Sequence, residues 1–204
     1  MLHYQTIRPG TLELLKQLQP LPELAGTRLV GGTALALQLG HRSSVDLDFF
    51  GSVNVATEDL RSAFEEGHNM SIVAEYRNIR QYMVDGVKVD VVNLKANWLE
   101  DAVIEDGLIL AGLKDIAAMK INAIVGRGSK KDFIDLSFLL EKFSLREMLE
   151  FFIEKYPSGE VMLALKSLAY FADAEKDSMP EMFVNRSWDE VKEIVSKAVD
   201  EISF

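Results

Sequence analysis

Two aspartates, Asp46 and Asp48, stand on either side of one leucine in an otherwise apolar segment. Such a segment is typical of a β-strand, in which residues two apart project from the same face. The two carboxylates would then point together, while Val45, Leu47 and Phe49 face the core. Paired carboxylates repel each other unless a cation neutralises them, and Mg²⁺ is usually held by one or two carboxylates plus substrate phosphates. The spacing predicts a Mg²⁺ or Mn²⁺ site; two ordinary acids on an exposed strand edge are the alternative.

A third aspartate, Asp90, interrupts a second strongly apolar segment, residues 87–93. We expect Asp90 to lie close to Asp46 and Asp48 and to complete a set of three metal-binding, catalytic carboxylates. A solvent-facing position on an alternating strand would explain Asp90 equally well if it is considered alone.

Gly31, Gly32 and Thr33 fall at a predicted turn from strand to helix. Glycine lets the backbone approach a phosphate closely, and the free N–H groups at the start of a helix bind anions. The three residues are therefore predicted to bind phosphate beside the metal; a tight turn that needs positive φ is the alternative. Arg42, on the loop that leads to the aspartates, is predicted either to contact phosphate or to be solvated.

Lys120 lies in the middle of the apolar stripe of a predicted helix, and Arg127 lies on the same face two turns further along. A buried lysine costs free energy unless it is paired or faces a polar cleft. Lys120 and Arg127 are therefore predicted to reach nucleotide phosphates, with Lys120 held by Asp132 or Asp135. A purely structural ion pair with one of these acids is the alternative.

The elements that position these residues are predicted from hydrophobic periodicity and turn residues, with Asp85-Gly86 as the strongest hairpin signal. Strands are predicted at residues 28–30, 45–50, 71–76, 80–84, 87–93 and 108–111. Helices are predicted at residues 10–19, 33–39, 58–66, 113–125, 132–142, 145–155, 159–172 and 188–202. We therefore expect an α/β (α+β) core over residues 1–110 and a helical C-terminal region over residues 111–204 packed on it.

Composition limits the class of protein. A chain of 204 residues with 48% hydrophobic residues fits a globular protein, and no apolar run approaches the length of a membrane span. The chain has no cysteine, which excludes disulfides and thiolate metal sites, and we expect a cytoplasmic protein. A formal net charge of -10 argues against a long nucleic-acid groove, although it leaves room for a local basic cleft.

Two blocks of the sequence resemble a known family. The turn Gly31-Gly32-Thr33 followed by Asp46-Leu47-Asp48 resembles the first motif of polymerase-β-like nucleotidyltransferases. More narrowly, GGTALALQLGHRSSVDLDFF resembles the opening motif of the AbiEii/AbiGii-type toxins of type IV toxin–antitoxin and abortive-infection systems. The second block, LKDIAAMKINAIVGRGSKKDFIDLSFLL, resembles the downstream acid–lysine helix and Asp-x-x-Asp segment of that family.

The resemblance implies a polymerase-β-like nucleotidyltransferase core with a mixed, largely antiparallel sheet flanked by helices. The family often has a serine where this chain has Gly32, so that a hydroxyl contact with phosphate falls to Thr33. The residue roles that it implies are metal ligands (Asp46, Asp48), third carboxylate (Asp90), helix lysine with its acidic partner (Lys120, Asp115), and acids of the last motif (Asp132, Asp135).

The function that the resemblance implies is transfer of a nucleoside monophosphate from an NTP to a hydroxyl of RNA, such as a tRNA 3′ end, or of a protein. A cognate antitoxin is the implied partner. A glycosyltransferase also uses Asp-x-Asp to hold a metal, and a catalytically silent member would act as a binding or regulatory protein. Apolar residues of the C-terminal helices are expected to form core, or else an antitoxin contact; they include Phe151, Phe152, Tyr170 and Phe171.

Overall fold

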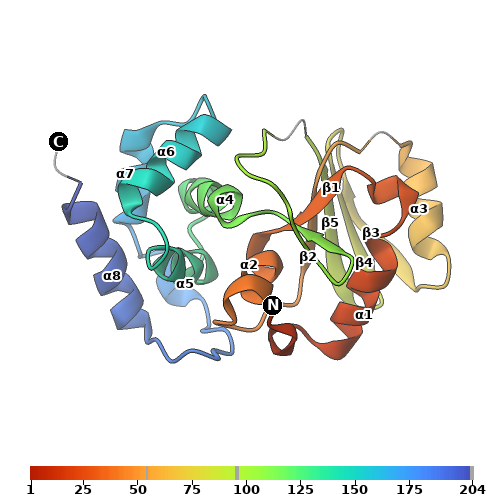
Figure 1. Ribbon diagram of the computed structural model, residues 1–204, viewed down its shortest axis with the longest axis horizontal. Helices are drawn as coiled ribbons and strands as arrows, with labels where there is room; N and C mark the ends of the chain where they lie inside the picture. The colour runs from red at the N-terminus through yellow and green to blue at the C-terminus, as the bar shows by residue number, and fades with distance from the viewer. Residues whose placement is uncertain (54, 95–96, 203–204) are drawn as a thin grey trace.

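The computed structural model describes residues 1–53, 55–94 and 97–202 (Figure 1). Its α-helices are α1 (Pro9–Leu18), α2 (Gly31–Leu39), α3 (Thr57–Glu65), α4 (Leu113–Gly126), α5 (Lys130–Leu139), α6 (Leu145–Lys155), α7 (Val161–Leu168) and α8 (Trp188–Asp200). Its strands are β1 (Thr27–Val30), β2 (Leu47–Gly51), β3 (Met70–Glu75), β4 (Ile79–Val84), β5 (Val87–Asn93), β6 (Val103–Glu105) and β7 (Leu108–Leu110). Short 3-10 helices are η1 (Tyr4–Thr6), η2 (Pro22–Leu24) and η3 (Ala174–Lys176).

The strands form one sheet in the order β3-β4-β5-β2-β1-β7-β6. The β2/β5 and β1/β7 pairs are parallel, and the other neighbouring pairs are antiparallel. The fold is therefore the predicted mixed α/β arrangement with a largely antiparallel sheet. The β4–β5 hairpin turns at Asp85 and Gly86, whose φ angles of 48° and 78° give the left-handed turn that this pair predicts.

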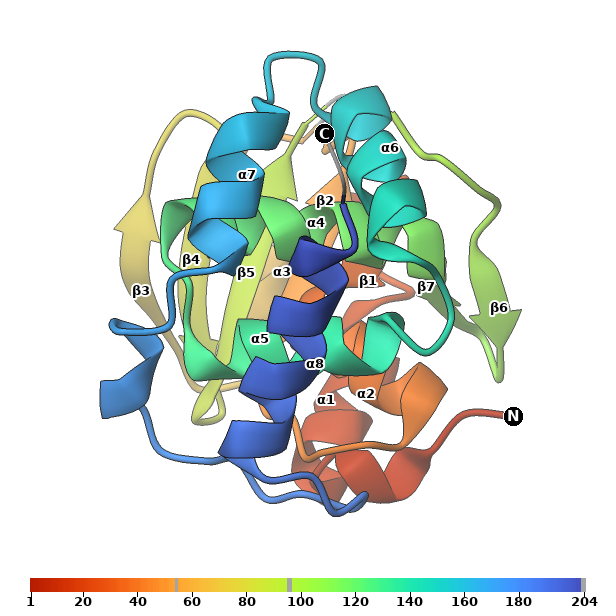
Figure 2. The same ribbon diagram turned by 90° about the vertical axis from the view of Figure 1, so that its left-hand side faces the viewer.

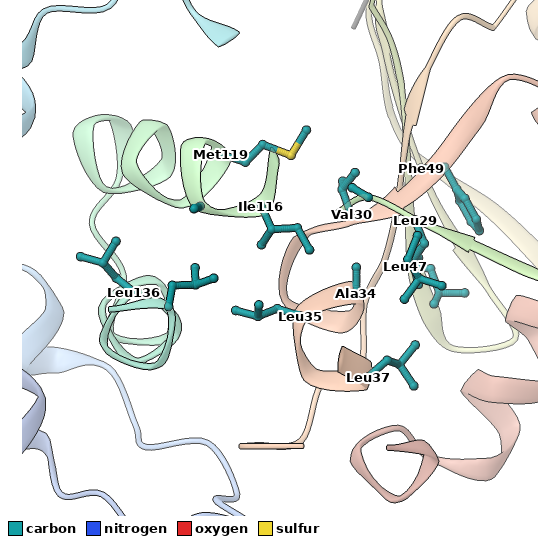
Figure 3. Close-up of a cluster of buried hydrophobic side chains, with 14 of the residues drawn as sticks. Leu29, Val30, Ala34, Leu35, Leu37, Leu47, Phe49, Ile116, Met119 and Leu136 are labelled. Atoms are coloured by element: carbon teal, nitrogen blue, oxygen red, sulfur yellow. The ribbon is translucent and has the colours of Figure 1, made fainter. Parts of the chain in front are cut away.

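Helices cover both faces of the sheet. In Figure 1, α1 and α3 lie on one side of the central strands, and α2 and α4 lie on the other. Figure 3 shows Leu47 and Phe49 of β2 directed away from α4, whereas Val30 and Met119 lie between the sheet and that helix. Because β2 alternates, its other residues, including Asp48, are left for the face toward α4.

The C-terminal helices pack around α4, which contacts α5, α6 and α7, while α8 packs on α5 (Figure 2). Ser144 and Ser187 begin α6 and α8 with capping boxes, which fix where these two helices start. Helix α4 also contacts α2, so the predicted core (residues 1–110) and the predicted C-terminal region (residues 111–204) pack against each other. The division of the chain at residue 110 stays a prediction. None of the helices in the described ranges is long and apolar enough to span a membrane.

Several sequence-based expectations were wrong in detail. Helix α2 begins at Gly31 rather than residue 33, β2 begins at Leu47, and β6 was missed because three residues carry too little pattern. Val45 precedes the strand and is 36% exposed, so it does not face the core. Tyr170 follows the end of α7 and is 54% exposed, in contrast to the fully packed Phe152.

Candidate active site

The parallel pairing of β2 with β5 places Asp48 directly opposite Asp90. Adjacent strands lie about 4.8 Å apart, so the two carboxylates are neighbours on one face. That face is the one toward α4, because Leu47 and Val89, on the opposite face, are fully buried in the core. The expectation that Asp90 lies beside the first aspartates is therefore met for Asp48.

The negative charges of Asp48 and Asp90 repel each other. Burial first, and then the negative charges of Asp90 and Asp46, together raise the pKa of Asp48 to about 6. One oxygen of Asp90, Oδ2, accepts hydrogen bonds from Gln81 (2.9 Å) and Lys88 (2.7 Å). The other, Oδ1, is buried and has no hydrogen-bond partner among the described residues. An unsatisfied carboxylate oxygen beside a second carboxylate is an environment that favours a bound cation.

The donor set fits a hard cation only in part. Asp48 and Asp90 supply carboxylate oxygens, the ligands that Mg²⁺ prefers, and Mg²⁺ usually takes just one or two of them. Within the described ranges, however, no three acidic or histidine side chains are already grouped so that they could hold a metal ion. Asp46 is half-buried and precedes the strand. The structure thus brings two of the three predicted ligands into one register, and the metal itself stays a prediction.

The two glycines leave room for charged side chains. Gly31 has φ +68°, and a Cβ there would lie 2.4 Å from Asp48 Oδ2. A Cβ on Gly32 would lie 2.5 Å from Arg42 Nη2. Both residues open α2, where N–H groups lack helical partners. The turn therefore meets the requirement for positive φ and also brings the start of a helix against the aspartates.

We expect Gly31→Ala to destabilise the fold and to displace Asp48. A left-handed conformation at a residue with Cβ costs ~1–3 kcal/mol, and Cβ would collide with the Asp48 carboxylate. Urea unfolding should show this loss. Gly10→Ala is the matched control, because its Cβ meets nothing within 4 Å and it lies in α1; its stability should rise by less than about 1 kcal/mol. Equal stability of the two variants would contradict this account.

The hydroxyl group of Thr33 is already hydrogen-bonded within the protein. It is 1% exposed, and its Oγ1 lies 2.9 Å from Ser44 Oγ and within hydrogen-bond distance of the Asp46 carbonyl oxygen. The hydroxyl thus ties the start of α2 to the segment that enters β2. A direct contact with phosphate, which was predicted, would require Thr33 to give up these partners.

Lys120 is buried between two acids. It is 5% exposed, and its Nζ lies 2.6 Å from Asp135 and 3.1 Å from Asp132. Burial alone would lower the pKa of Lys120, but the charges of Asp135 and Asp132 raise it, so the ammonium keeps its proton. Burial would likewise raise the pKa of Asp132, yet Lys120 and Arg127 hold it at about 2. The predicted pairing of Lys120 with these aspartates is confirmed.

Asp135 also binds the side chains of Arg42 and His41. Arg42 donates to its two oxygens through Nε and Nη2, both at 2.7 Å, and His41 Nε2 lies 2.8 Å from Oδ1. Burial alone would raise the pKa of Asp135, but Arg42 and Lys120 hold it well below its ordinary value. Arg42 is 2% exposed, so the solvated alternative is wrong. A contact with phosphate would require its guanidinium to leave Asp135.

Asp115 does not pair with Lys120, although both lie on α4. Its carboxylate accepts a hydrogen bond from Lys155 at 2.6 Å and one from the backbone N–H of Leu99 at 3.1 Å. Asp115 therefore connects α4 with α6 and with the segment after β5. The two residues are five apart on a helix and so point in different directions, which the motif alone does not reveal.

One cavity of about 370 Å³ joins these parts. Gly31, Asp48 and Asp90 line its sheet side, and Lys120 and Arg127 line it from α4. Arg127 pairs with Asp132 at 3.0 Å while its side chain remains 71% exposed. Seven residues predicted for the site are absent from this lining among the described residues: Gly32, Thr33, Arg42, Asp46, Asp115, Asp132 and Asp135.

The cavity also contains residues that sequence reasoning missed. Asn122 lines it from α4, and Tyr156 lines it from the end of α6. Burial and then the charge of Asp115 raise the pKa of Tyr156 to about 12, so its hydroxyl stays neutral. Asn122 is two residues from Lys120 and five from Arg127, so helical spacing does not place it on their face. No sequence pattern connects Tyr156 with β2 and β5 either.

Comparison with known proteins bears on the family and the fold of this chain. The family model described as "Nucleotidyl transferase AbiEii toxin, Type IV TA system" matches residues 13–96. The chain is 34% identical over 183 residues to the uncharacterized protein aq_aa25 of Aquifex aeolicus (strain VF5), covering 85% of this chain and 86% of that protein.

Two crystal structures from Helicobacter pylori share the fold. One, of a proposed nucleotidyltransferase, has a TM-score of 0.56 at 20% identity and covers 96% of this chain and 95% of its own. The other, of JHP933, has a TM-score of 0.56 at 19% identity, with coverages of 96% and 93%. The chain has a nucleotidyltransferase fold and belongs to the AbiEii family of nucleotidyl transferase toxins.

Proposed function

We propose that the protein is a metal-dependent nucleotidyltransferase that moves a nucleoside monophosphate from an NTP to a hydroxyl. The observation that carries this proposal is the register of Asp48 opposite Asp90 across a cavity from Lys120, with Asp90 Oδ1 unpartnered among the described residues. Anionic and cationic side chains thus face one space large enough to hold substrate groups. Family membership supports the same reaction class.

Asp48 and Asp90 would hold Mg²⁺ or Mn²⁺, with Asp46 as a further ligand contributed from the start of the strand. Bound there, the ion supplies Lewis-acid polarisation of the phosphate oxygens. Its charge would also relieve the repulsion that raises the pKa of Asp48 to about 6, a shift that arises first from burial and then from Asp90.

Groups of the protein would bind the phosphates and accept the proton in this reaction. The N–H groups that open α2 at Gly31 and Gly32, together with Lys120 and Arg127, would neutralise the phosphates of the NTP. The acceptor oxygen attacks the α-phosphorus, the bond from that phosphorus to the bridging oxygen breaks, and pyrophosphate leaves. Asp90 would take the proton of the acceptor hydroxyl, since one of its oxygens has no other partner among the described residues. Asp135 and Asp132 hold Lys120 in place, and Arg42 in turn holds Asp135.

The family description supports the toxin role, with a cognate antitoxin as partner. The cytoplasm as the place of action is part of the same proposal. The acceptor is a hydroxyl of RNA, such as tRNA, or of a protein. The glycosyltransferase alternative would explain the aspartates, but not the lysine helix. A catalytically silent binding or regulatory protein would not need a protonated lysine and two carboxylates in the same cavity. Lys120, Asp48 and Asp90 line one cavity, which counts against this alternative.

Label transfer tests the proposal. Purified protein is incubated with Mg²⁺, each α-labelled NTP in turn, and total RNA or cell protein. We expect label to enter one acceptor class and Asp90→Asn to remove it. Asp59→Asn, which removes an equal charge from an exposed position on α3, is the matched control and should retain full transfer. No labelling with any NTP, or equal labelling by the wild type and Asp90→Asn, would overturn the proposal.

A further inference from the structure

The catalytic cavity has two chemically different ends. Gly31 and Asp48 lie at one end, where the metal and the phosphates would bind. Phe50 also lines the cavity, and because it stands two residues beyond Asp48 on β2, it projects from the same face about 6.6 Å further along the strand. There β2 pairs with Arg28 of β1, whereas Asp48 pairs with Val30, next to the glycine turn. Phe50 therefore marks the end of the cavity away from the phosphates.

A second aromatic ring, that of Tyr156, lies at the same end of the cavity. The guanidinium of Arg28 lies 4.3 Å from the centre of the Trp98 ring. Lys155, the residue before Tyr156, has its ammonium 4.6 Å from the centre of the same ring. Since Arg28 is the cross-strand partner of Phe50, these contacts bring the end of α6 to that part of the sheet. Two aromatic side chains of the lining are thus gathered away from the glycine turn.

Both rings are held by the protein and border the cavity. The Tyr156 ring is half-buried and packs on Phe152, with 5.8 Å between the ring centres. Phe50 is half-buried as well. Packing against the core would explain each ring alone. Rings that border a cavity whose other end is charged, however, offer surfaces on which a flat heterocycle can stack.

Helix α4 contributes an amide to the same cavity. Met119, Asn122 and Gly126 are three and four residues apart, so they form a row along the helix, separate from that of Lys120 and Arg127. Asn122 is exposed, and its side chain has no hydrogen-bond partner among the described residues. An amide offers a donor and an acceptor side by side, which matches the edge of a nucleobase. Phosphates offer acceptors only, and the two cations match them.

We propose that this end of the cavity selects the NTP by its base, which stacks on Tyr156 and Phe50 while the amide of Asn122 hydrogen-bonds to its edge. The proposal rests on the proposed nucleotidyl transfer, to which it adds base selection. An amide held in one orientation distinguishes adenine and cytosine, which carry an amino group, from guanine and uracil, which carry a carbonyl group, because donor and acceptor exchange places. Asn122 is thus a specificity-determining residue, and the two rings supply affinity for the base.

Equilibrium binding tests this inference separately from the reaction. Isothermal titration calorimetry with Mg²⁺ and without acceptor gives the Kd of each of the four NTPs and of inorganic tripolyphosphate, which lacks a base. We expect the four NTP values of the wild type to differ by about tenfold or more, as for one bidentate contact, and Asn122→Ala to reduce this spread to about threefold. Tyr156→Leu should weaken the binding of every NTP about tenfold or more and that of tripolyphosphate less than about twofold. Tyr156→Phe keeps the ring and should bind each NTP within about threefold of the wild type.

Asn185→Ala and Tyr76→Leu are matched controls, because both residues are exposed and lie outside the lining of the cavity. They should bind every probe as the wild type does. Equal affinity of the wild type for all four NTPs, an unchanged spread in Asn122→Ala, or an equal loss of NTP and tripolyphosphate binding in Tyr156→Leu would overturn this inference, even in a protein that transfers label. Base-selective binding that depends on Asn122 and Tyr156, in a protein that transfers no label, would support the base site while it sinks the proposed reaction.

Discussion

Replacing Asp48 with asparagine should stabilise the metal-free protein and remove nucleotidyl transfer. Asp48 has a pKa of about 6, because burial and the nearby Asp90 and Asp46 disfavour its charge. Relative to an ordinary value of 3.8, this shift costs the folded state ~1–3 kcal/mol at pH 7, and a neutral amide removes the cost. Loss of a metal ligand should reduce the transfer rate by about 10³-fold or more, equivalent to several kcal/mol.

The gain in stability has a defined pH dependence. A carboxyl group whose pKa is raised on folding binds more protons in the folded than in the unfolded state. Its destabilising effect is therefore complete above pH 6 and disappears as the pH falls toward 3.8. The stability difference between Asp48→Asn and the wild type should shrink between pH 6 and pH 4. An unchanged difference across this window would contradict the shared burial of the two carboxylates.

Thermal unfolding in the presence of a chelator gives the stability difference, and added Mg²⁺ or Mn²⁺ tests the metal independently of activity. A ligand that binds only the folded state raises its unfolding temperature. We expect this rise in the wild type and not in Asp48→Asn. Asp59→Asn again serves as control and should show the wild-type response. An equal rise in Asp48→Asn and the wild type would mean that Asp48 does not hold the ion.

Replacing Asp135 with asparagine should cause a large loss of stability. Asp135 is fully buried and forms ion pairs with Arg42 and Lys120. These two cations are themselves only 2% and 5% exposed. Removing one member of a buried ion pair leaves uncompensated buried charge and costs ~3–5 kcal/mol. Because Arg42 and Lys120 hold the pKa of Asp135 well below its ordinary value, against the effect of burial, this contribution is complete above pH 3.8 and is lost only at lower pH.

Comparison with Lys120→Met makes the test specific. That variant leaves Asp135 bonded by both Nε and Nη2 of Arg42, so its loss of stability should be smaller than that of Asp135→Asn. Urea unfolding followed by tryptophan fluorescence measures both. The control is Asp189→Asn, whose side chain is 92% exposed beside Lys192; its stability should change by less than about 0.5 kcal/mol. A change of that size in Asp135→Asn would show that the buried network contributes little.

The sequence by itself predicted five residues that line one cavity, together with others that do not line it; the five are Gly31, Asp48, Asp90, Lys120 and Arg127. Alternation within each apolar strand predicts that Asp48 and Asp90 project from the face opposite their buried neighbours, and helical spacing places Lys120 in a buried stripe. The pair Gly31-Gly32 predicts a turn at the start of a helix, and Asp85-Gly86 predicts the hairpin that carries Asp90. These features depend on a few neighbouring residues, so local chemistry is enough to predict them.

Only the tertiary structure decided which of these residues meet. The parallel neighbours β2 and β5 are separated in sequence by α3 and two strands, and this pairing sets Asp48 beside Asp90. The partner of Asp115 is Lys155, forty residues away. Arg42 donates hydrogen bonds to Asp135. A cavity of about 360 Å³ between the end of α4 and residues of α7 likewise depends on the packing of these two helices. Strand order and the pairing of buried charges depend on contacts between distant segments, which no local periodicity encodes.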